Sequence, residues 1–92
     1  MLPPLGLNGG VFMRIDKFLK NSRLIKRRTL ANEACDQQRV MINGKVAKPG
    51  TEVKVGDIVE IHFGNNISKV EVLSVEEHVS KAEAKEMYRL IQ

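Results

Sequence analysis

The sequence has no tryptophan, one cysteine and only four other aromatic residues, and these scarcities limit what the chain can be. One cysteine cannot form an internal disulfide, and the two histidines lie far from it in sequence, so no ligand cluster for a metal is expected. The single cysteine favours a reducing, cytoplasmic compartment. No run of about 18 apolar residues occurs, so no membrane span is expected.

Groups that could carry catalysis are equally scarce. Cys35 falls on the apolar side of an expected helix and is interpreted as a small core residue. His62 and His78 have no nucleophile beside them, and no glycine-rich phosphate loop is followed by a Lys-Ser or Lys-Thr pair. We therefore predict a protein that is not an enzyme and needs no cofactor.

Positive charge is abundant, and it is unevenly distributed. Residues 13–48 contain ten Lys or Arg and three Asp or Glu, a balance of +7, whereas residues 49–92 contain five and eight, a balance of −3. The stretch RLIKRRT at positions 23–29 places four cations within six residues. Solubility alone does not require such a separation, which indicates a polyanionic partner for the first half.

Ninety-two residues suffice for one domain with a small core. The first twelve residues, MLPPLGLNGGVF, carry no charge and lack the basic start of a secretory signal. We interpret residues 1–12 as a flexible N-terminal extension, 13–79 as the folded domain and 80–92 as a C-terminal helix.

Two short helices are predicted in the basic half. Over 14–21 the apolar residues Ile15, Phe18 and Leu19 share one face, and Asp16 is spaced to pair with Lys20. A second helix is predicted over 29–37, with Thr29 or a neighbour as its N-cap. Its expected apolar face comprises Leu30, Ala31, Ala34 and Cys35.

Short strands and turns follow. The pair Asn43-Gly44 is a strong signal for a type I′ hairpin between strands at 40–42 and 45–47. Further strands are predicted over 58–63 and 67–75. Ser80 and Glu83 fit a capping box that would open the terminal helix over 80–92. The expected class is therefore α+β, with two short helices on a small, mostly antiparallel sheet and a C-terminal helix.

The cations cluster where the second helix begins. A helix N-terminus carries partial positive charge, so each cation there costs roughly 0.3–1 kcal/mol at low salt. A bound phosphate would remove this conflict, because free N–H groups and guanidinium groups would bind it together. Cations from the first helix, the connection and the hairpin are expected to form one phosphate-binding stripe. They are Arg14, Lys17, Lys20, Arg23, Lys26, Arg27, Arg28, Lys45 and Lys48.

The type of nucleic acid follows from the neighbouring side chains. Phe18 is the only aromatic residue in the basic half, and it lies on the apolar face, so base stacking there is not expected. Reading of backbone and shape suits structured RNA. A helix-turn-helix bound to DNA stays open, although Glu33 and Asp36 on the second helix suit a phosphate-lined groove poorly.

Four motifs together resemble an S4 RNA-binding domain. They are MRIDKFL (13–19), SRLIKRRTLA (22–31), VMINGKVAKP (40–49) and VKVGDIVEI (53–61). The short length, the RIDKFL opening and AKEMY (84–88) are similar to the small ribosome-associated S4 proteins of the heat-shock type. Within these, the chain most resembles the Gram-positive ribosome-quality-control branch, since the long basic C-terminal tail of the heat-shock relatives is missing.

The resemblance implies binding to ribosomal RNA of the large subunit and to peptidyl-tRNA on stalled ribosomes. It also implies assistance to a factor that adds C-terminal alanine tails without a template, and a natural start at Met13. A monomer is expected. Matching the motifs adds Thr29 and Asp16 to the RNA-binding set. Two positions depart from many S4 domains, with Gln38 in place of glycine and Arg27 in place of serine.

Three other functions remain open from the residues alone. The chain could be the RNA-binding subunit or domain of an RNA-modifying enzyme, such as a pseudouridine synthase, whose catalytic part would be separate. It could be a DNA-binding regulator. It could also be a protein-interaction adaptor that uses the acidic C-terminal half.

Overall fold

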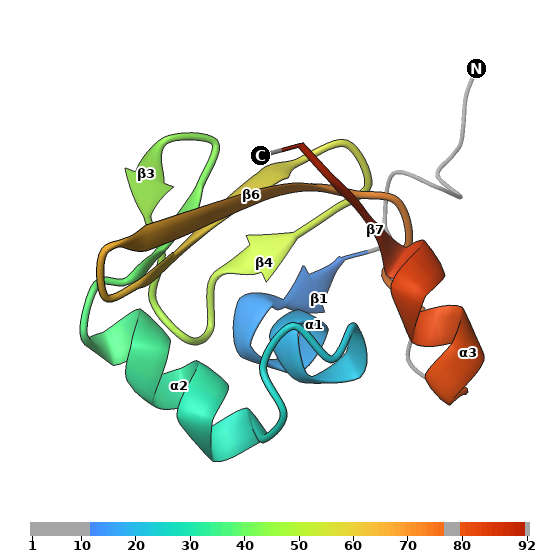
Figure 1. Ribbon diagram of the computed structural model, residues 1–92, viewed down its shortest axis with the longest axis horizontal. Helices are drawn as coiled ribbons and strands as arrows, with labels where there is room; N and C mark the ends of the chain where they lie inside the picture. Colours follow the sequence, from blue (N-terminus) through green and yellow to red (C-terminus); the bar gives the residue numbers. More distant parts are fainter. Residues whose placement is uncertain (1–11, 77–79, 92) are drawn as a thin grey trace.

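Two short helices pack beneath a five-stranded antiparallel sheet in the computed structural model, which describes residues 12–76 and 80–91 (Figure 1). The sheet has the strand order β3-β2-β5-β6-β7, and β1 pairs with β4 in a separate two-stranded ladder. Every pairing is antiparallel. The elements are β1 (Met13–Arg14), α1 (Ile15–Asn21), α2 (Arg28–Asp36), β2 (Val40–Ile42), β3 (Lys45–Val46), β4 (Glu52–Val53), β5 (Ile58–Phe63), β6 (Asn66–Val72), α3 (Lys81–Ala84), a 3-10 turn (Lys85–Met87) and β7 (Tyr88–Leu90).

The core lies between α1 and the sheet. Ile15, Phe18 and Leu19 of α1 are fully buried, as their helical spacing predicts. Val70 and Val72 of β6 are also fully buried, because alternate residues of a strand point to the same face. The amphipathic pattern of α1 therefore fixes which side of this helix faces solvent, and that side carries the cations.

The hairpin between β2 and β3 has the predicted turn. Asn43 has φ 51° and Gly44 has φ 85°, as a type I′ turn requires. The Asn43 side chain also ties the turn to β5, since its amide donates to Asp57 Oδ1 at 3.1 Å and its oxygen accepts from the Ile58 N–H at 2.9 Å. Asp57 is thus a buried anchor for the hairpin.

Both helices end at a residue in the left-handed region. Arg23 after α1 has φ 63° and Gln38 after α2 has φ 62°. The Gln38 N–H donates to the Cys35 carbonyl, and the Arg39 N–H donates to the Ala34 carbonyl, each at 2.9 Å. This is a Schellman motif. Gln38 therefore keeps the cap geometry that glycine usually provides, at some cost in backbone strain.

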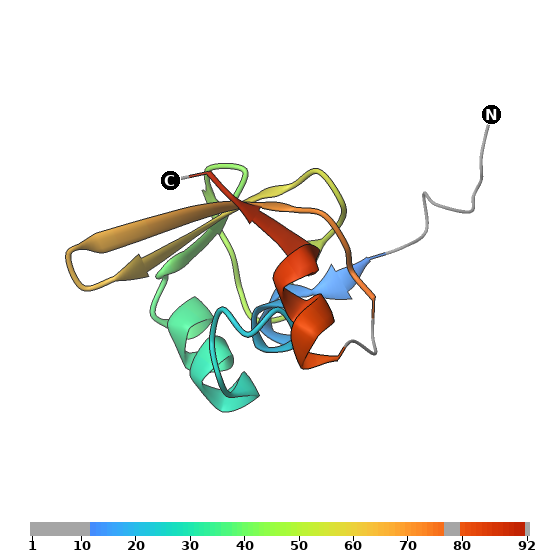
Figure 2. The same cartoon turned by 45° about the vertical axis from the view of Figure 1, so that its right-hand side comes forward.

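The C-terminal segment differs from the prediction. Ser80 and Glu83 form the predicted capping box, but the α-helix covers only Lys81–Ala84. After the 3-10 turn, Tyr88–Leu90 pair with β6 as a fifth strand. The red segment in Figure 2 shows this return onto the sheet. Leu90 and Ile91, which fall within the predicted terminal helix, are exposed.

The other helix predictions need smaller corrections. α1 starts at Ile15 rather than Arg14, and α2 covers Arg28–Asp36 rather than 29–37. The cap predicted at Thr29 or a neighbour is wrong, because the N-cap of α2 is Arg27, two residues earlier, and its side chain makes no capping hydrogen bond. Leu30 was placed on the apolar face but is 49% exposed. The predicted N-terminal extension lies outside the described residues except for Phe12, and positions 77–79 lie outside them as well.

Candidate nucleic-acid interface

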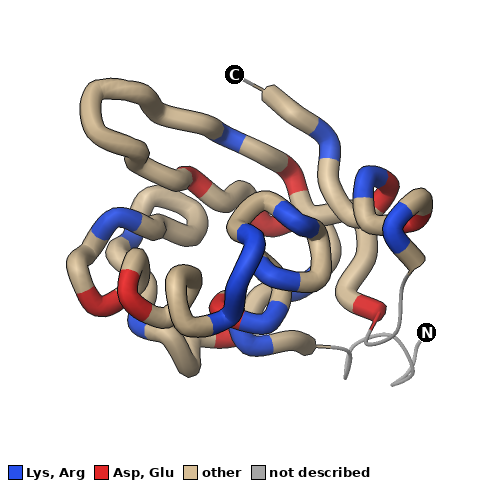
Figure 3. The backbone as a smooth tube through the Cα atoms, turned by 60° about the horizontal axis from the view of Figure 1, so that its bottom comes forward, with Lys and Arg blue, Asp and Glu red and all other residues tan. Residues whose placement is uncertain are grey.

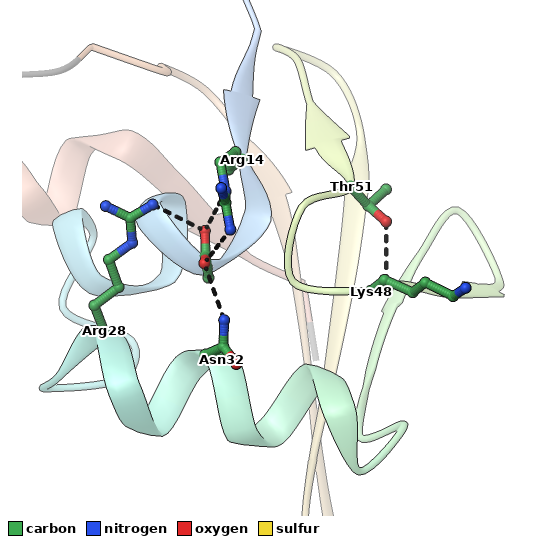
Figure 4. A network of polar contacts seen from close by, with 6 residues as sticks. Arg14, Arg28, Asn32, Lys48 and Thr51 are labelled. Carbon is green, nitrogen blue, oxygen red and sulfur yellow. Dashed lines mark hydrogen bonds and ion pairs between the residues drawn. The ribbon is translucent and has the colours of Figure 1, made fainter.

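Asp16 is the centre of a polar network that joins the start of α1 to the start of α2. Figure 4 labels its partners Arg14, Arg28 and Asn32. Its carboxylate accepts two hydrogen bonds from Arg14, at 3.2 Å from Nε and 3.0 Å from Nη2. Arg28 Nη2 lies 3.6 Å from Asp16 Oδ1, and the Asn32 amide donates to Oδ2 at 3.5 Å. One carboxylate thus holds two guanidinium groups from different elements.

The burial of this network is uneven. The Asp16 side chain is 2% exposed, whereas the side chains of Arg14 and Arg28 are 51% and 48% exposed. Burial by itself raises the pKa of Asp16. The hydrogen bonds from Arg14 and the charge of Arg28 outweigh burial, so the pKa lies below its ordinary value. Asp16 is therefore ionised at neutral pH. Because its side chain is buried, it cannot contact a large ligand directly.

One expectation about Asp16, its pairing with Lys20, is wrong. It pairs with Arg14 and Arg28 rather than with Lys20, because it points toward α2 and not along the exposed face of α1. Its place in the RNA-binding set was inferred from the acidic position of the family motif, and this stays a prediction. Its burial and its two arginine partners favour a role in orienting the arginines. Asn32 was missed, although its spacing of four residues from Arg28 places both on one side of α2.

The N-terminus of α2 is free to receive an anion. Among the described residues no side chain caps it, and its first turn contains no acidic residue. Arg27 and Arg28 flank this end of the helix with exposed side chains. A shallow, open groove lies alongside it, lined by Arg14, Asp16, Arg28, Thr29, Asn32 and Glu33. The unfavourable clustering of cations at a helix N-terminus, which was expected from the sequence, is therefore present.

The loop that follows the hairpin is attached to the same corner. The Ile15 N–H donates to the Thr51 carbonyl at 2.7 Å, and the Lys48 N–H donates to Thr51 Oγ1 at 2.9 Å. Figure 4 shows Lys48 and Thr51 beside the start of α1. Lys48 thus lies near the Asp16 network. Lys45 instead lies on β3, the edge strand of the sheet.

The remaining predicted cations lie on α1 and on the connection to α2, where Figure 3 shows Lys and Arg gathered. Lys17 is half-buried and the others are exposed. Arg23 is also the residue in the left-handed conformation that follows the end of α1. The members of this group are Lys17, Lys20, Arg23, Lys26 and Arg27.

Other chemistry is not apparent in the part of the chain that the structure describes. No three or more His, Cys, Asp or Glu side chains come together there as metal ligands. Burial raises the pKa of the Cys35 thiol to about 11, with the negative charges of Asp16 and Asp36 adding to the effect. None of the described helices has the length and apolar character to cross a membrane.

Comparison with known proteins gives a consistent result. The model of the S4 domain family matches residues 13–59. "RQC P-site tRNA stabilizing factor" of Halalkalibacterium halodurans is 56% identical over 78 residues, which cover 85% of this chain and 89% of that protein. The Listeria monocytogenes protein of the same name is 50% identical over 80 residues and 87% of each chain. The trimeric structure of Vibrio cholerae Heat Shock Protein 15 has a TM-score of 0.79 at 27% identity, covering 88% of this chain and 83% of that one.

Proposed function

The chain belongs to the S4 domain family, and from this premise we propose that it binds RNA of the large ribosomal subunit and stabilises peptidyl-tRNA in the P site during ribosome quality control. It acts by binding, without catalysis. The named relatives cover most of this chain and are matched over most of their own length, which supports transfer of the role. The family and the class of function expected from the sequence agree with these comparisons.

One observation carries the mechanism: the buried Asp16 carboxylate fixes two half-exposed arginines beside an uncapped helix N-terminus. Guanidinium groups held in place bind phosphate with little further loss of side-chain entropy. The free N–H groups of α2 add partial positive charge directed at the same position. Together these groups would bind the phosphates of a folded RNA backbone and hold the RNA in one orientation.

The RNA-binding set that we propose combines this centre with the surrounding cations. Direct contacts are assigned to Arg14, Lys17, Lys20, Arg23, Lys26, Arg27, Arg28, Thr29, Lys45 and Lys48, with Asp16 as the positioning residue. The protein would work in the cytoplasm, beside a factor that adds alanine tails to the nascent chain. We expect a monomer, in contrast to the trimeric Vibrio protein, and size-exclusion chromatography with light scattering tests this.

Salt dependence of binding tests the phosphate-clamp mechanism. The association constant for a structured ribosomal RNA fragment should fall steeply as the salt concentration rises. On logarithmic axes the slope should have a magnitude of about 0.7–0.9 per phosphate contact. Arg28→Ala should lower this slope by about one contact. Lys85→Ala removes the same charge from the other half of the chain and should leave the slope unchanged.

The rival functions predict different results in the same assay. Equal affinity for a DNA duplex of matched length would favour a DNA-binding regulator. A slope near zero for every nucleic acid would favour a protein-interaction adaptor and would refute the phosphate clamp. Strong binding to RNA with no preference for large-subunit fragments would instead fit a subunit of an RNA-modifying enzyme.

A further inference from the structure

A second hollow lies on the other side of Glu33, which lines both this hollow and the groove beside Asp16. Its volume is about 390 Å³, within the range of roughly 300–1,000 Å³ that small-molecule sites occupy. Its walls come from α2, from the connections before and after it and from the end of β5. They are Ile25, Leu30, Ala34 and Phe63, with Glu33, Gln37 and Arg39 as the polar members.

Two large apolar side chains of this hollow are exposed. Leu30 is 49% exposed and Phe63 is 43% exposed, and they come from positions more than thirty residues apart. Backbone hydrogen bonds fix their proximity. The Arg39 N–H donates to the Ala34 carbonyl at 2.9 Å, and the His62 N–H donates to the Arg39 carbonyl at 2.8 Å. The end of β5, and with it Phe63, is therefore tied to the end of α2.

The charges around the hollow match a nucleotide. Arg39 lines the hollow just after the end of α2. Arg27 does not line it but lies one turn before Leu30, at the start of the same helix. Cations at both ends of an apolar floor suit phosphates on either side of a base that rests on the floor. An apolar peptide would fill the floor but would give these two cations no partner.

The polar members have a complementary role toward a base. The carboxylate of Glu33 can accept a hydrogen bond from an amino group on a base edge. The amide of Gln37 can donate and accept at such an edge. The aromatic ring of Phe63 offers a surface on which any base can stack. The hollow thus adjoins the basic surface and carries groups that can contact a base.

We propose that this hollow binds one unpaired nucleobase of the same RNA whose backbone binds beside Arg28. The inference rests on the proposed function and extends it from backbone contacts to a single-base contact. It also revises the expectation that the basic half has no stacking surface, because the ring is supplied by β5 from outside that half. An RNA with a bulged or unstacked nucleotide should therefore bind more tightly than a fully paired one.

Two RNA hairpins of equal stem sequence test this, one fully paired and one with a single bulged 2-aminopurine. Wild-type protein should bind the bulged hairpin more tightly and quench its fluorescence. Phe63→Ala should weaken binding of the bulged hairpin about fivefold or more, since one stacked base contributes at least this much, and should change the paired hairpin less than twofold. Phe63→Trp should retain both the affinity and the quenching.

Ile67→Ala provides the control, because Ile67 lies on the same hairpin, is 47% exposed and does not line the hollow. Circular-dichroism melting verifies that each variant folds. Equal effects of Phe63→Ala on both hairpins, or no effect on either, would overturn the base pocket while leaving the phosphate clamp intact. Wild-type RNA affinity in Phe63→Ala together with loss of a protein partner would assign the hollow to protein binding. If wild-type protein bound neither hairpin in a salt-dependent way, the proposed function would fall together with the inference.

Discussion

Replacing Asp16 with asparagine should weaken RNA binding even though it makes the protein more positive. Simple charge counting predicts the opposite, because removing a negative charge from a basic surface favours a polyanion. In the structure, however, Asp16 is the group that holds Arg14 and Arg28 in place. Without its charge the two side chains regain rotamer freedom, and we expect the loss of about one phosphate contact, a slope change of ~0.7–0.9.

The same substitution should lower the free energy of unfolding. A hydrogen bond to a charged group contributes about 1.5–3 kcal/mol. Because both arginines are about half-exposed and can return to water, a value of ~1–2 kcal/mol is reasonable for the network. For a domain of this size, ~1 kcal/mol lowers the melting temperature by about 4–8 °C.

The pH dependence has a definite sign. The pKa of Asp16 is lowered in the folded state, so the unfolded chain takes up the proton first as pH falls. The stabilisation is complete above the unfolded pKa of about 3.9 and is lost as pH falls through the folded pKa. Wild type and Asp16→Asn should therefore differ most near pH 6–7 and converge in acid. Asp57, whose pKa is also lowered, acts in the same direction in both proteins and does not affect the difference.

Urea unfolding at several pH values and RNA titration at several salt concentrations measure these effects. Asp57→Asn is a matched control, because Asp57 is also a buried carboxylate with a cationic partner. Its partner is a lysine, and it anchors the hairpin rather than the two arginines. It should lower stability without lowering the salt slope of RNA binding. Tighter RNA binding by Asp16→Asn would refute the positioning role, as would a stability difference that stays constant down to pH 2.

Three further predictions concern the helix ends and the core. Arg28→Ala should reduce association with the large subunit while changing stability by less than ~1 kcal/mol, since its ion pair is half-exposed; loss of folding by circular dichroism would instead make Arg28 structural. Gln38→Gly should raise the free energy of unfolding by ~0.5–1 kcal/mol, and with it the melting temperature, because φ 62° suits glycine. Gln37→Gly, at φ −87°, should not raise it, and calorimetry distinguishes the two variants. Cys35, with a thiol pKa of about 11, should react slowly with iodoacetamide at pH 8 in the folded protein and quickly in urea, and fast reaction of the folded protein would contradict its burial.

Local signals in the sequence were sufficient for much of the fold. The spacing of Ile15, Phe18 and Leu19 predicted the buried face of α1, and Asn43-Gly44 predicted the type I′ hairpin. Both depend on residues close together in the chain. The capping box likewise predicted where α3 begins, because its hydrogen bonds span three residues.

Errors arose where distant residues decide the outcome. Tyr88–Leu90 form a strand because β6 offers a free edge, and no local pattern reports that edge. Asp16 was assigned to Lys20 by helical spacing, yet α2 brings Arg28 closer. Leu30 has an apolar side chain at a helical position but faces a hollow completed by Phe63 from β5.

The most direct test of the central claim is sedimentation of a tagged protein through a sucrose gradient. The protein should co-migrate with free large subunits that carry peptidyl-tRNA, and puromycin release of the nascent chain should reduce this association. Arg28→Ala should shift the protein toward the top of the gradient, while Lys85→Ala should sediment as wild type does. Wild-type protein that stays at the top, with stalled large subunits present, would contradict the proposed function.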